Sequence, residues 1–273
     1  MDFSEQFNKS RKISVIDYDL AKTIESGQIF RREKLPEQQG YLVFSRNTYC
    51  RVRQDGNVLY LDSFGEPNER YWPFMFAVNE HDDRLEALMS VTPFLREAYD
   101  FSKGIRILRQ DPWEALISFI VSQNNNIPRI KKCINAVCHS KGRILGYGHY
   151  GFPKPEDLRP IALCNCGLGY RERYIYDAAS AVANGTLNLT RLHASCSTPM
   201  RAMQELIQLR GVGTKVAECT MLFGLMHDNV FPVDVWISRA MKEGNITQLD
   251  VEGFGRSAGL VQQHIYYYML NRR

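Results

Sequence analysis

The chain of 273 residues lacks a long apolar run. No stretch approaches the roughly 18 consecutive apolar residues that a membrane-spanning helix needs. The first five residues, Met-Asp-Phe-Ser-Glu, also lack the apolar segment of a secretory signal. We therefore expect no membrane association, and a cytoplasmic protein that is associated with the nucleoid if the source is prokaryotic.

The sequence also lacks a regular arrangement of cysteines. The seven cysteines are odd in number and scattered: Cys50, Cys133, Cys138, Cys164, Cys166, Cys196 and Cys219. This scatter disfavours a secreted disulfide scaffold, so we expect reduced thiols. Neither Cys164-x-Cys166 nor Cys133-x4-Cys138 has a second pair at the spacing of a zinc or iron–sulfur site. We expect no metal cluster.

Strong charge of one sign is absent as well. The 34 Lys and Arg residues against 30 Asp and Glu residues give a formal net charge of +4 at pH 7. This small excess allows a polyanionic partner but does not require one. With 44% hydrophobic and 23% charged residues and no internal repeat, the sequence is typical of a globular protein. Its length suits one large domain or two modest ones.

Alternating apolar and polar residues mark the first part of the chain as β-rich. Residues 49–53 (Tyr-Cys-Arg-Val-Arg) alternate, and residues 58–61 read as a returning strand. Between them, Asp55-Gly56 is typical of a two-residue hairpin turn. Another strand of the same sheet is expected at residues 41–44. These patterns predict an antiparallel hairpin within a β module.

Helical spacing replaces this pattern from about residue 80. Leu85, Leu88 and Met89 recur at i, i+3 and i+4, which indicates one face of a helix. Asp111-Pro112 is typical of an N-cap followed by proline at the first helical position. We expect mostly helices from there to the C-terminus.

Shorter signals complete the predicted organisation. Residues 19–25 are expected to form a short helix closed by Gly27, and Pro128 is expected to begin a helix after a run of asparagines. The predicted fold class is α+β. An N-terminal antiparallel β module is assigned to residues 1–100, and a mostly helical domain to residues 101–273.

The segment from residue 201 to residue 241 carries the strongest chemical signal. A helix is expected to end at Leu209-Arg210 because residues 211–213 (Gly-Val-Gly) follow at once. A second helix is expected to begin at Thr214 or Lys215. Two helices joined by a glycine hairpin can bind a phosphate through backbone N–H groups and the positive helix end.

Three side chains near this hairpin are candidates for chemistry. Lys215 lies in the first turn of the second helix, where the helix dipole and desolvation disfavour its ammonium form. Cys219 lies one turn later on the same face, and Asp234 stands where it can cap a third helix. Each feature alone also has an ordinary explanation, since most helical lysines are surface residues, most such aspartates are only caps, and many tight turns need two glycines.

Taken together, these residues resemble a known superfamily. Residues 209–217 (Leu-Arg-Gly-Val-Gly-Thr-Lys-Val-Ala), followed by residues 233–235 (Val-Asp-Val), resemble the helix-hairpin-helix DNA glycosylases, which carry a Gly/Pro-rich loop and an essential aspartate. In that superfamily a lysine at the start of the second helix marks the bifunctional branch, which excises a base and nicks the abasic strand. The resemblance implies Lys215 as the amine nucleophile and Asp234 as its carboxylate partner.

The resemblance narrows to 8-oxoguanine DNA glycosylases and covers nearly the whole chain. Residues 26–28 (Ser-Gly-Gln) look like the family segment whose glycine, here Gly27, accepts the N7 hydrogen that 8-oxoguanine has and guanine lacks. Gln262 matches a glutamine that reads the Watson–Crick edge of the extruded base. Tyr266 matches an aromatic that stacks on the base, and Cys219 would pack on its other face.

Other matches concern the opposite strand. Asn124, Arg129 and Arg171 resemble side chains that fill the vacated space and hold the orphaned cytosine, and Tyr170 resembles the wedge that buckles the duplex. Without the resemblance, the asparagines would be interpreted as a polar turn before a helix, and the arginines as surface charges.

The DNA-phosphate contacts implied by the resemblance fall on Gly211, Val212, Gly213 and Trp236. Trp236 is a departure, because family members carry a histidine there, although its indole N–H could donate one hydrogen bond. Tyr266 replaces a phenylalanine, which preserves stacking.

The resemblance therefore implies a bifunctional glycosylase of base excision repair. It would excise 8-oxoguanine, preferentially opposite cytosine, by Schiff-base chemistry on Lys215, and then cut the strand by β-elimination. The expected partner is double-stranded DNA containing 8-oxoguanine, bound by a monomer with no obligate protein partner. No cofactor is expected, although the carbonyls of Leu209 and Val212 could hold a structural cation.

Three alternatives remain open at this stage. One is a glycosylase for alkylated or other bases on the same fold, which would need neither Lys215 nor Gln262. A non-catalytic DNA-binding module would explain the hairpin but not the spacing to Asp234. A protein-interaction scaffold has only the β module in its favour.

Overall fold

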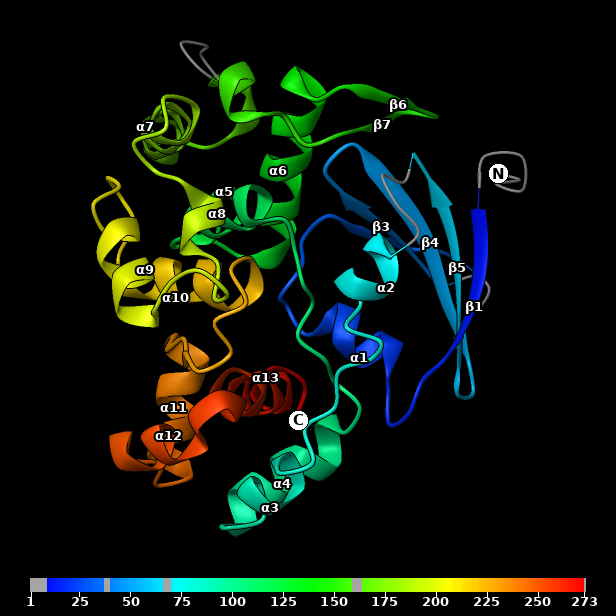
Figure 1. The fold of residues 1–273 in the computed structure, drawn as a ribbon, viewed down its shortest axis with the longest axis vertical. Helices are drawn as coiled ribbons and strands as arrows, with labels where there is room; N and C mark the ends of the chain where they lie inside the picture. Colours follow the sequence, from blue (N-terminus) through cyan, green and yellow to red (C-terminus); the bar gives the residue numbers. More distant parts are fainter. Residues whose placement is uncertain (1–8, 37–39, 66–69, 159–163, 273) are drawn as a thin grey trace.

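A computed structural model of the chain describes residues 9–36, 40–65, 70–158 and 164–272. In these residues an antiparallel sheet near the N-terminus lies beside a helical body that contains most of the remaining chain (Figure 1). The α+β class predicted from the sequence is therefore confirmed.

The sheet has five strands in the order β1-β5-β4-β3-β2, and every neighbouring pair is antiparallel. Along β5, buried and half-buried residues alternate, because one face of the strand lies on an apolar core. In chain order the strands are Lys9–Ser14 (β1), Arg32–Lys34 (β2), Tyr41–Ser45 (β3), Thr48–Asp55 (β4) and Val58–Phe64 (β5).

The predicted hairpin is confirmed, with a small shift at its turn. Asp55 pairs with Val58, so the two-residue loop consists of Gly56 and Asn57 rather than Asp55 and Gly56. Gly56 has a φ of +52°, which favours glycine at this position. Strands β1 and β2 were not predicted, because neither sequence shows a clear apolar alternation.

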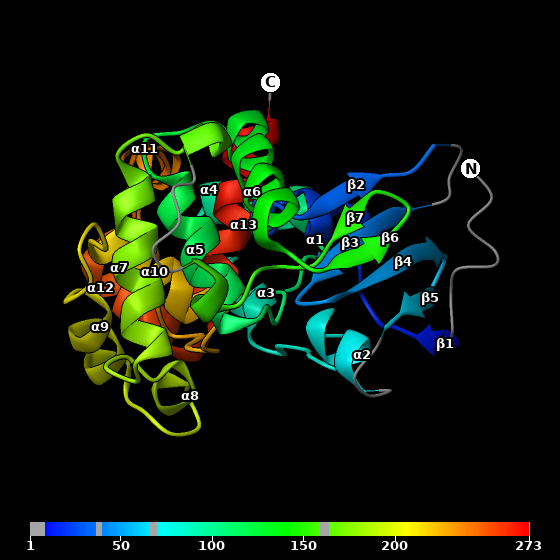
Figure 2. The same ribbon diagram turned by 90° about the horizontal axis from the view of Figure 1, so that it is seen from above.

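Every residue of β3 is buried because both faces of the strand are covered. Tyr41 and Val43 belong to the core of the module, which lies beneath α1 and α2. Leu42 and Phe44, on the other face, pack with Leu145 from a short hairpin of the helical body. Figure 2 shows this hairpin, β6–β7, next to β3.

The remaining elements follow in chain order. They are α1 (Leu20–Glu25), α2 (Tyr71–Met75), α3 (Leu85–Leu88), α4 (Pro93–Ser102), α5 (Pro112–Ser122), α6 (Ile127–Lys141), β6 (Ile144–Gly146), β7 (His149–Tyr150), α7 (Arg171–Ala183), α8 (Leu189–Leu192), α9 (Pro199–Leu206), α10 (Thr214–Phe223), α11 (Val235–Glu243), α12 (Gln248–Phe254) and α13 (Ala258–Asn271), with 3-10 turns at Pro155–Leu158, Cys164–Cys166 and Gly255–Ser257.

Several predicted helix starts agree with the structure. The short helix expected at residues 19–25 forms as α1 and begins at Leu20, with Asp19 as its N-cap. Asp111 caps α5 with Pro112 in its first turn, as predicted. The helix expected to start at Pro128 begins one residue earlier, because Asn126 is its N-cap and accepts a hydrogen bond from the N–H of Arg129.

The helical body contains two apolar cores. One surrounds α5, whose residues 113–121 are all buried, and includes α6, α7, α9 and α10. The other is built by α4, α11, α12 and α13, together with α3. Since α3 precedes residue 100 and α4 spans it, packing continues across the boundary predicted there, and that boundary stays a prediction.

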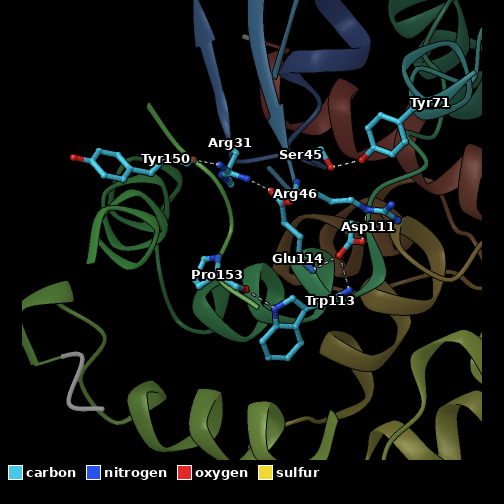
Figure 3. A network of polar contacts seen from close by, with 9 residues as sticks. All are labelled: Arg31, Ser45, Arg46, Tyr71, Asp111, Trp113, Glu114, Tyr150 and Pro153. Atoms are coloured by element: carbon cyan, nitrogen blue, oxygen red, sulfur yellow. Dashed lines mark hydrogen bonds and ion pairs between the residues drawn. The ribbon is translucent and has the colours of Figure 1, made fainter. Parts of the chain in front are cut away.

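A buried ion pair fastens the β module to the helical body (Figure 3). Arg31, next to β2, donates from Nη1 to Oε1 of Glu114 in α5 at 2.9 Å, and both side chains are buried. Arg31 also donates to the carbonyl of Tyr150 at 2.6 Å. The other carboxylate oxygen of Glu114 accepts the backbone N–H of Arg46 at 2.9 Å. Because these partners satisfy both charges, the contact has a defined geometry.

Removing one side of this pair should destabilise the fold strongly. We expect Glu114→Ala to lower the free energy of unfolding by about 3 kcal/mol, since it leaves the Arg31 guanidinium buried without a counter-charge. Urea denaturation would measure the change. Glu86→Ala, which removes an exposed partner of Arg96, serves as the control and should cost less than about 1 kcal/mol. Equal effects of the two substitutions would contradict the importance assigned to the buried pair.

Candidate active site

The hairpin between α9 and α10 forms as predicted, although α9 ends at Leu206, three residues before the expected Leu209. Gly211 has a φ of +78°, and an added Cβ there would lie 2.2 Å from Cδ2 of Tyr174. Both the backbone and the available space therefore require glycine at this position. Helix α10 begins at Thr214, in agreement with the prediction.

The amino end of α10 is free of side-chain capping. Gly213 is its N-cap and supplies no side-chain hydrogen bond, and Gly213 and Thr214 are exposed. The first N–H groups of a helix need partners from outside the helix, and the helix dipole favours an anion there. The end of α10 is thus suited to a phosphate, the role predicted for Gly211, Val212 and Gly213.

Lys215 is half-buried in the first turn of α10. Its Nζ lies 5.5 Å from the centroid of the Phe119 ring, which belongs to α5. Cys219 lies one turn later and is 4% exposed. Burial raises the pKa of the Cys219 thiol to about 11, against the opposing effect of nearby Lys215, so the thiol is neutral near pH 7. Cys219 therefore presents an uncharged surface beside Lys215.

Asp234 is the N-cap of α11, as predicted. Its Oδ1 accepts hydrogen bonds from the N–H groups of Trp236 and Ile237, each at 2.9 Å. Because Oδ1 makes both capping bonds, Oδ2 is not needed for them. The carboxylate can therefore hold the helix and act on a neighbouring group at once.

A cavity of about 610 Å³ brings most of the candidate residues together. Residues of the β module, of the loop between α5 and α6, and of α10, α11 and α13 line this cavity. Its lining includes the predicted residues Gly27, Asn124, Lys215, Cys219, Asp234, Trp236, Gln262 and Tyr266. Arg129, Tyr170, Arg171 and the hairpin residues Gly211, Val212 and Gly213 are not part of this lining.

The wall supplied by the β module depends on Gly27. This residue has a φ of +78°, and an added Cβ would lie 2.9 Å from Cε1 of Tyr266. The neighbouring Gln28 fixes the loop, because its Nε2 donates to the carbonyl of Arg106 at 2.8 Å and its Oε1 accepts the N–H of Leu108 at 2.7 Å. Gly27 and the Tyr266 ring are therefore held against each other.

Two glutamines of α13 also line the cavity. Gln262 donates from Nε2 to the carbonyl of Pro232 at 3.0 Å, and its Oε1 accepts from Nε2 of Gln263 at 3.1 Å. Tyr266 follows one turn after Gln262. Burial, together with nearby Asp234, raises the pKa of its hydroxyl, so this group remains a neutral donor.

Residues predicted to act on the opposite strand gather at a second place. The guanidinium of Arg171 is buried and donates to the carbonyls of Gln123 at 2.9 Å, Asn124 at 3.0 Å and Leu168 at 3.2 Å. Arg171 would have to exchange these partners to hold a base. Asn124 has a φ of +44° in the same loop.

Arg129 and Tyr170 lie at the outer side of this group. Arg129 is exposed and donates to the carbonyl of Gly167 at 3.4 Å. The Tyr170 ring is 53% exposed, and the Arg171 guanidinium carbon lies 4.6 Å from its centroid. An exposed aromatic supported by a cation has the form of a wedge, although its insertion into DNA stays a prediction.

Four further residues at the site were missed from the sequence. Phe119 and Gln263 line the cavity, and the doubled glutamine at 262–263 in an otherwise apolar helix was the available signal for Gln263. Arg239 is exposed one turn after Trp236, with its guanidinium carbon 5.5 Å from the ring centroid of the tryptophan. Burial raises the pKa of Glu218, on α10, to about 7.

The structure also yields two general observations about its described residues. No helix among them is long and apolar enough to cross a membrane. No group of three or more His, Cys, Asp or Glu side chains among them is arranged to hold a metal ion.

Parts of the chain are similar to known DNA glycosylases. Residues 11–116 match the family model for the N-terminal domain of 8-oxoguanine DNA glycosylase. The chain is 41% identical over 156 residues to the N-glycosylase/DNA lyase of Saccharomyces cerevisiae, a match that spans 51% of this chain and 42% of the yeast protein.

Two solved structures are similar over almost the whole chain. MBOgg1 in complex with a low-affinity DNA ligand has 35% identity and a TM-score of 0.87, covering 96% of this chain and 95% of that one. The 8-oxoguanine glycosylase/lyase of Clostridium acetobutylicum, in complex with double-stranded DNA containing cytosine opposite 8-oxoG, has 30% identity and a TM-score of 0.84, covering 96% and 98%.

Proposed function

Because this chain belongs to the 8-oxoguanine DNA glycosylase family, we propose that it removes 8-oxoguanine from double-stranded DNA as an N-glycosylase and abasic-site lyase of base excision repair. One observation carries the proposal: Lys215, Asp234 and the predicted base-pocket residues all line the same cavity. An amine, a carboxylate and flat, uncharged walls are the groups that glycosylase chemistry on an extruded base needs.

In this proposal the extruded base lies between Cys219 and Tyr266. A neutral thiol and an aromatic ring suit the two faces of an uncharged purine. The carbonyl of Gly27 accepts the N7 hydrogen of 8-oxoguanine, and Gln262 contacts the Watson–Crick edge. Since guanine has no hydrogen at N7, it would leave that carbonyl without a partner, which disfavours the undamaged base.

The proposed chemistry begins at the side-chain nitrogen of Lys215. Its nitrogen forms a bond to the sugar C1′ while the bond from C1′ to the base breaks and the base leaves with the electron pair. Opening of the sugar ring then gives a Schiff base between Lys215 and C1′. Loss of a proton from C2′ and departure of the 3′ phosphate complete β-elimination and cut the strand.

Asp234 supports this sequence without attacking the sugar. Its carboxylate stabilises the positive charge that develops on the sugar as the base departs, and it orients Lys215.

The chemistry uses only side chains of this protein, so no cofactor is required. A cation held by the carbonyls of Leu209 and Val212 would be structural, and the Leu209 carbonyl already accepts the N–H of Val212 at 3.0 Å.

The DNA backbone is proposed to bind at the helix ends near the cavity. The uncapped N–H groups of α10 would hold one phosphate. Trp236, which stands where relatives carry a histidine, would donate its indole N–H to another. Arg239, stacked on that ring, adds the positive charge that tryptophan lacks.

A strand-scission assay tests the proposed function. A duplex with one 8-oxoguanine opposite cytosine is incubated with the protein, and the products are separated with and without alkali. We expect cutting without alkali, which reports excision followed by the lyase step. Cutting only after alkali would refute the lyase step, and an intact strand under both conditions would refute the proposal. The same assay on duplexes that contain alkylated bases tests the alternative of a glycosylase for other bases on the same fold. Excision of those bases instead of 8-oxoguanine would support that alternative.

Recognition of the opposite base gives a separate prediction. We expect excision opposite cytosine to be at least about tenfold faster than excision opposite adenine, because one good contact to a base edge supplies about 1–3 kcal/mol of discrimination. Arg129→Ala should remove most of that difference in rate. Arg191→Ala on α8, also exposed, is the control and should keep the preference. Single-turnover rates opposite all four bases measure it, and equal rates in the unmodified protein would contradict the prediction.

A further inference from the structure

Gln263 is the least explained polar side chain of the cavity. It is 3% exposed and lines the cavity beside Gln262. Its Oε1 is buried and has no hydrogen-bond partner among the described residues. A buried amide oxygen without a donor is unfavourable, so its retention at a ligand cavity suggests that the ligand supplies the donor.

The orientation of both amides follows from their partners. The carbonyl of Pro232 can only accept, so the atom of Gln262 that contacts it must be the nitrogen. The oxygen of Gln262 then faces Gln263, which must present its own nitrogen. Gln263 is left with its oxygen unpaired. The oxygens of Gln262 and Gln263 and the remaining N–H of each amide are then left to pair with a ligand at this cavity.

These groups include the one donor and two acceptors that the Watson–Crick edge of a guanine-type base needs. That edge presents an acceptor at O6, a donor at N1 and a donor at the 2-amino group. An adenine-type edge instead presents a donor at the 6-amino group and an acceptor at N1, and has no amino group at position 2. The guanine type thus supplies a donor for each of the two amide oxygens, whereas the adenine type supplies only one.

We propose that Gln263 is a second base-reading residue, whose Oε1 accepts a hydrogen bond from the 2-amino group of the extruded base. The inference rests on the proposed function, since it requires a guanine-type base in the cavity. It adds a direct contact at the 2-amino group. Gln263 also fixes Gln262, because its Nε2 holds the Gln262 oxygen in place.

The test combines one side-chain change with one change of substrate. Gln263→Met keeps a similar length but cannot accept the bond, and 8-oxohypoxanthine is 8-oxoguanine without the 2-amino group. Single-turnover excision of both bases opposite cytosine is measured for both proteins. We expect the unmodified protein to excise 8-oxoguanine about tenfold faster than 8-oxohypoxanthine, the effect of one buried hydrogen bond. For Gln263→Met the ratio should fall to about one.

Two controls make the result decisive. Gln248→Met, at an exposed position on α12, should keep the tenfold ratio. Urea denaturation of Gln263→Met should give a free energy of unfolding close to that of the unmodified protein, which shows that the variant is folded.

Other outcomes overturn the inference in recognisable ways. An unchanged ratio in Gln263→Met, whatever its absolute rates, would show that Gln263 does not contact the 2-amino group. Unfolding of the variant under the assay conditions would show that the side chain supports the fold rather than the base. Failure of the unmodified protein to excise 8-oxoguanine at all, with abasic nicking retained, would refute the proposed function and the inference that rests on it.

Discussion

Lys215→Gln is expected to abolish covalent trapping on 8-oxoguanine DNA and to slow excision by roughly 10³-fold or more, because the variant has no nucleophile. Borohydride reduces the carbon–nitrogen double bond of the proposed Schiff base and makes the link to DNA permanent. A glutamine amide has a similar length but cannot form that bond. The shift of labelled DNA to a protein-linked band on a denaturing gel measures the effect.

The control for this prediction is Lys12→Gln, which removes an exposed lysine from the edge strand β1. That variant should trap as efficiently as the unmodified protein. DNA binding should survive in Lys215→Gln, since the proposed phosphate contacts come from backbone amides and from α11. If Lys215→Gln still traps DNA, another amine is the nucleophile and the proposed mechanism is wrong.

Asp234→Asn is expected to slow excision by about 10²-fold, as is typical when one electrostatic partner of a transition state is removed. Asparagine caps helices about as well as aspartate, so the two bonds to the N–H groups of Trp236 and Ile237 should persist. Only the negative charge is lost. Single-turnover excision measures the rate, and urea denaturation measures the free energy of unfolding.

Asp19→Asn is the matched control, because Asp19 also caps a helix through its side chain but lies outside the cavity lining. Both variants should unfold within about 1 kcal/mol of the unmodified protein. If Asp234→Asn excises the base at the full rate, the carboxylate is only a cap. If it is inactive because it is unfolded, the denaturation curve will show it.

Local sequence signals predicted the starts of the two helices that carry the candidate catalytic residues Lys215 and Asp234. The start of α10 at Thr214 and the cap of α11 at Asp234 follow from glycine and aspartate at fixed offsets, and the structure confirms both. The end of α9 was predicted too late. Backbone bonds close a turn there, from the N–H of Leu209 to the carbonyl of Leu206, and the apolar pattern does not distinguish such a turn from further helix.

Features set by distant partners could not be predicted in this way. The short hairpin β6–β7 was missed because its strands are only a few residues long and are stabilised by packing of Leu145 on the sheet. Arg171 was expected to face DNA, but carbonyls of the loop after α5 surround its guanidinium. The orientation of Gln262 depends on Pro232, thirty residues earlier in the chain. The catalytic and binding roles assigned to these residues stay predictions.

Segments that are far apart in the sequence build the cavity, so the ribosome makes them at different times. Gly27 emerges from the ribosome long before Gln262 and Tyr266, which belong to α13. Lys215 and Asp234 both precede that helix. A nascent polypeptide that stops before α13 would therefore carry the proposed nucleophile and its carboxylate without the part of the proposed base pocket that Gln262 and Tyr266 supply. In the proposed site, the contacts to the Watson–Crick edge and the stacking ring are therefore added only after the proposed nucleophile has been made.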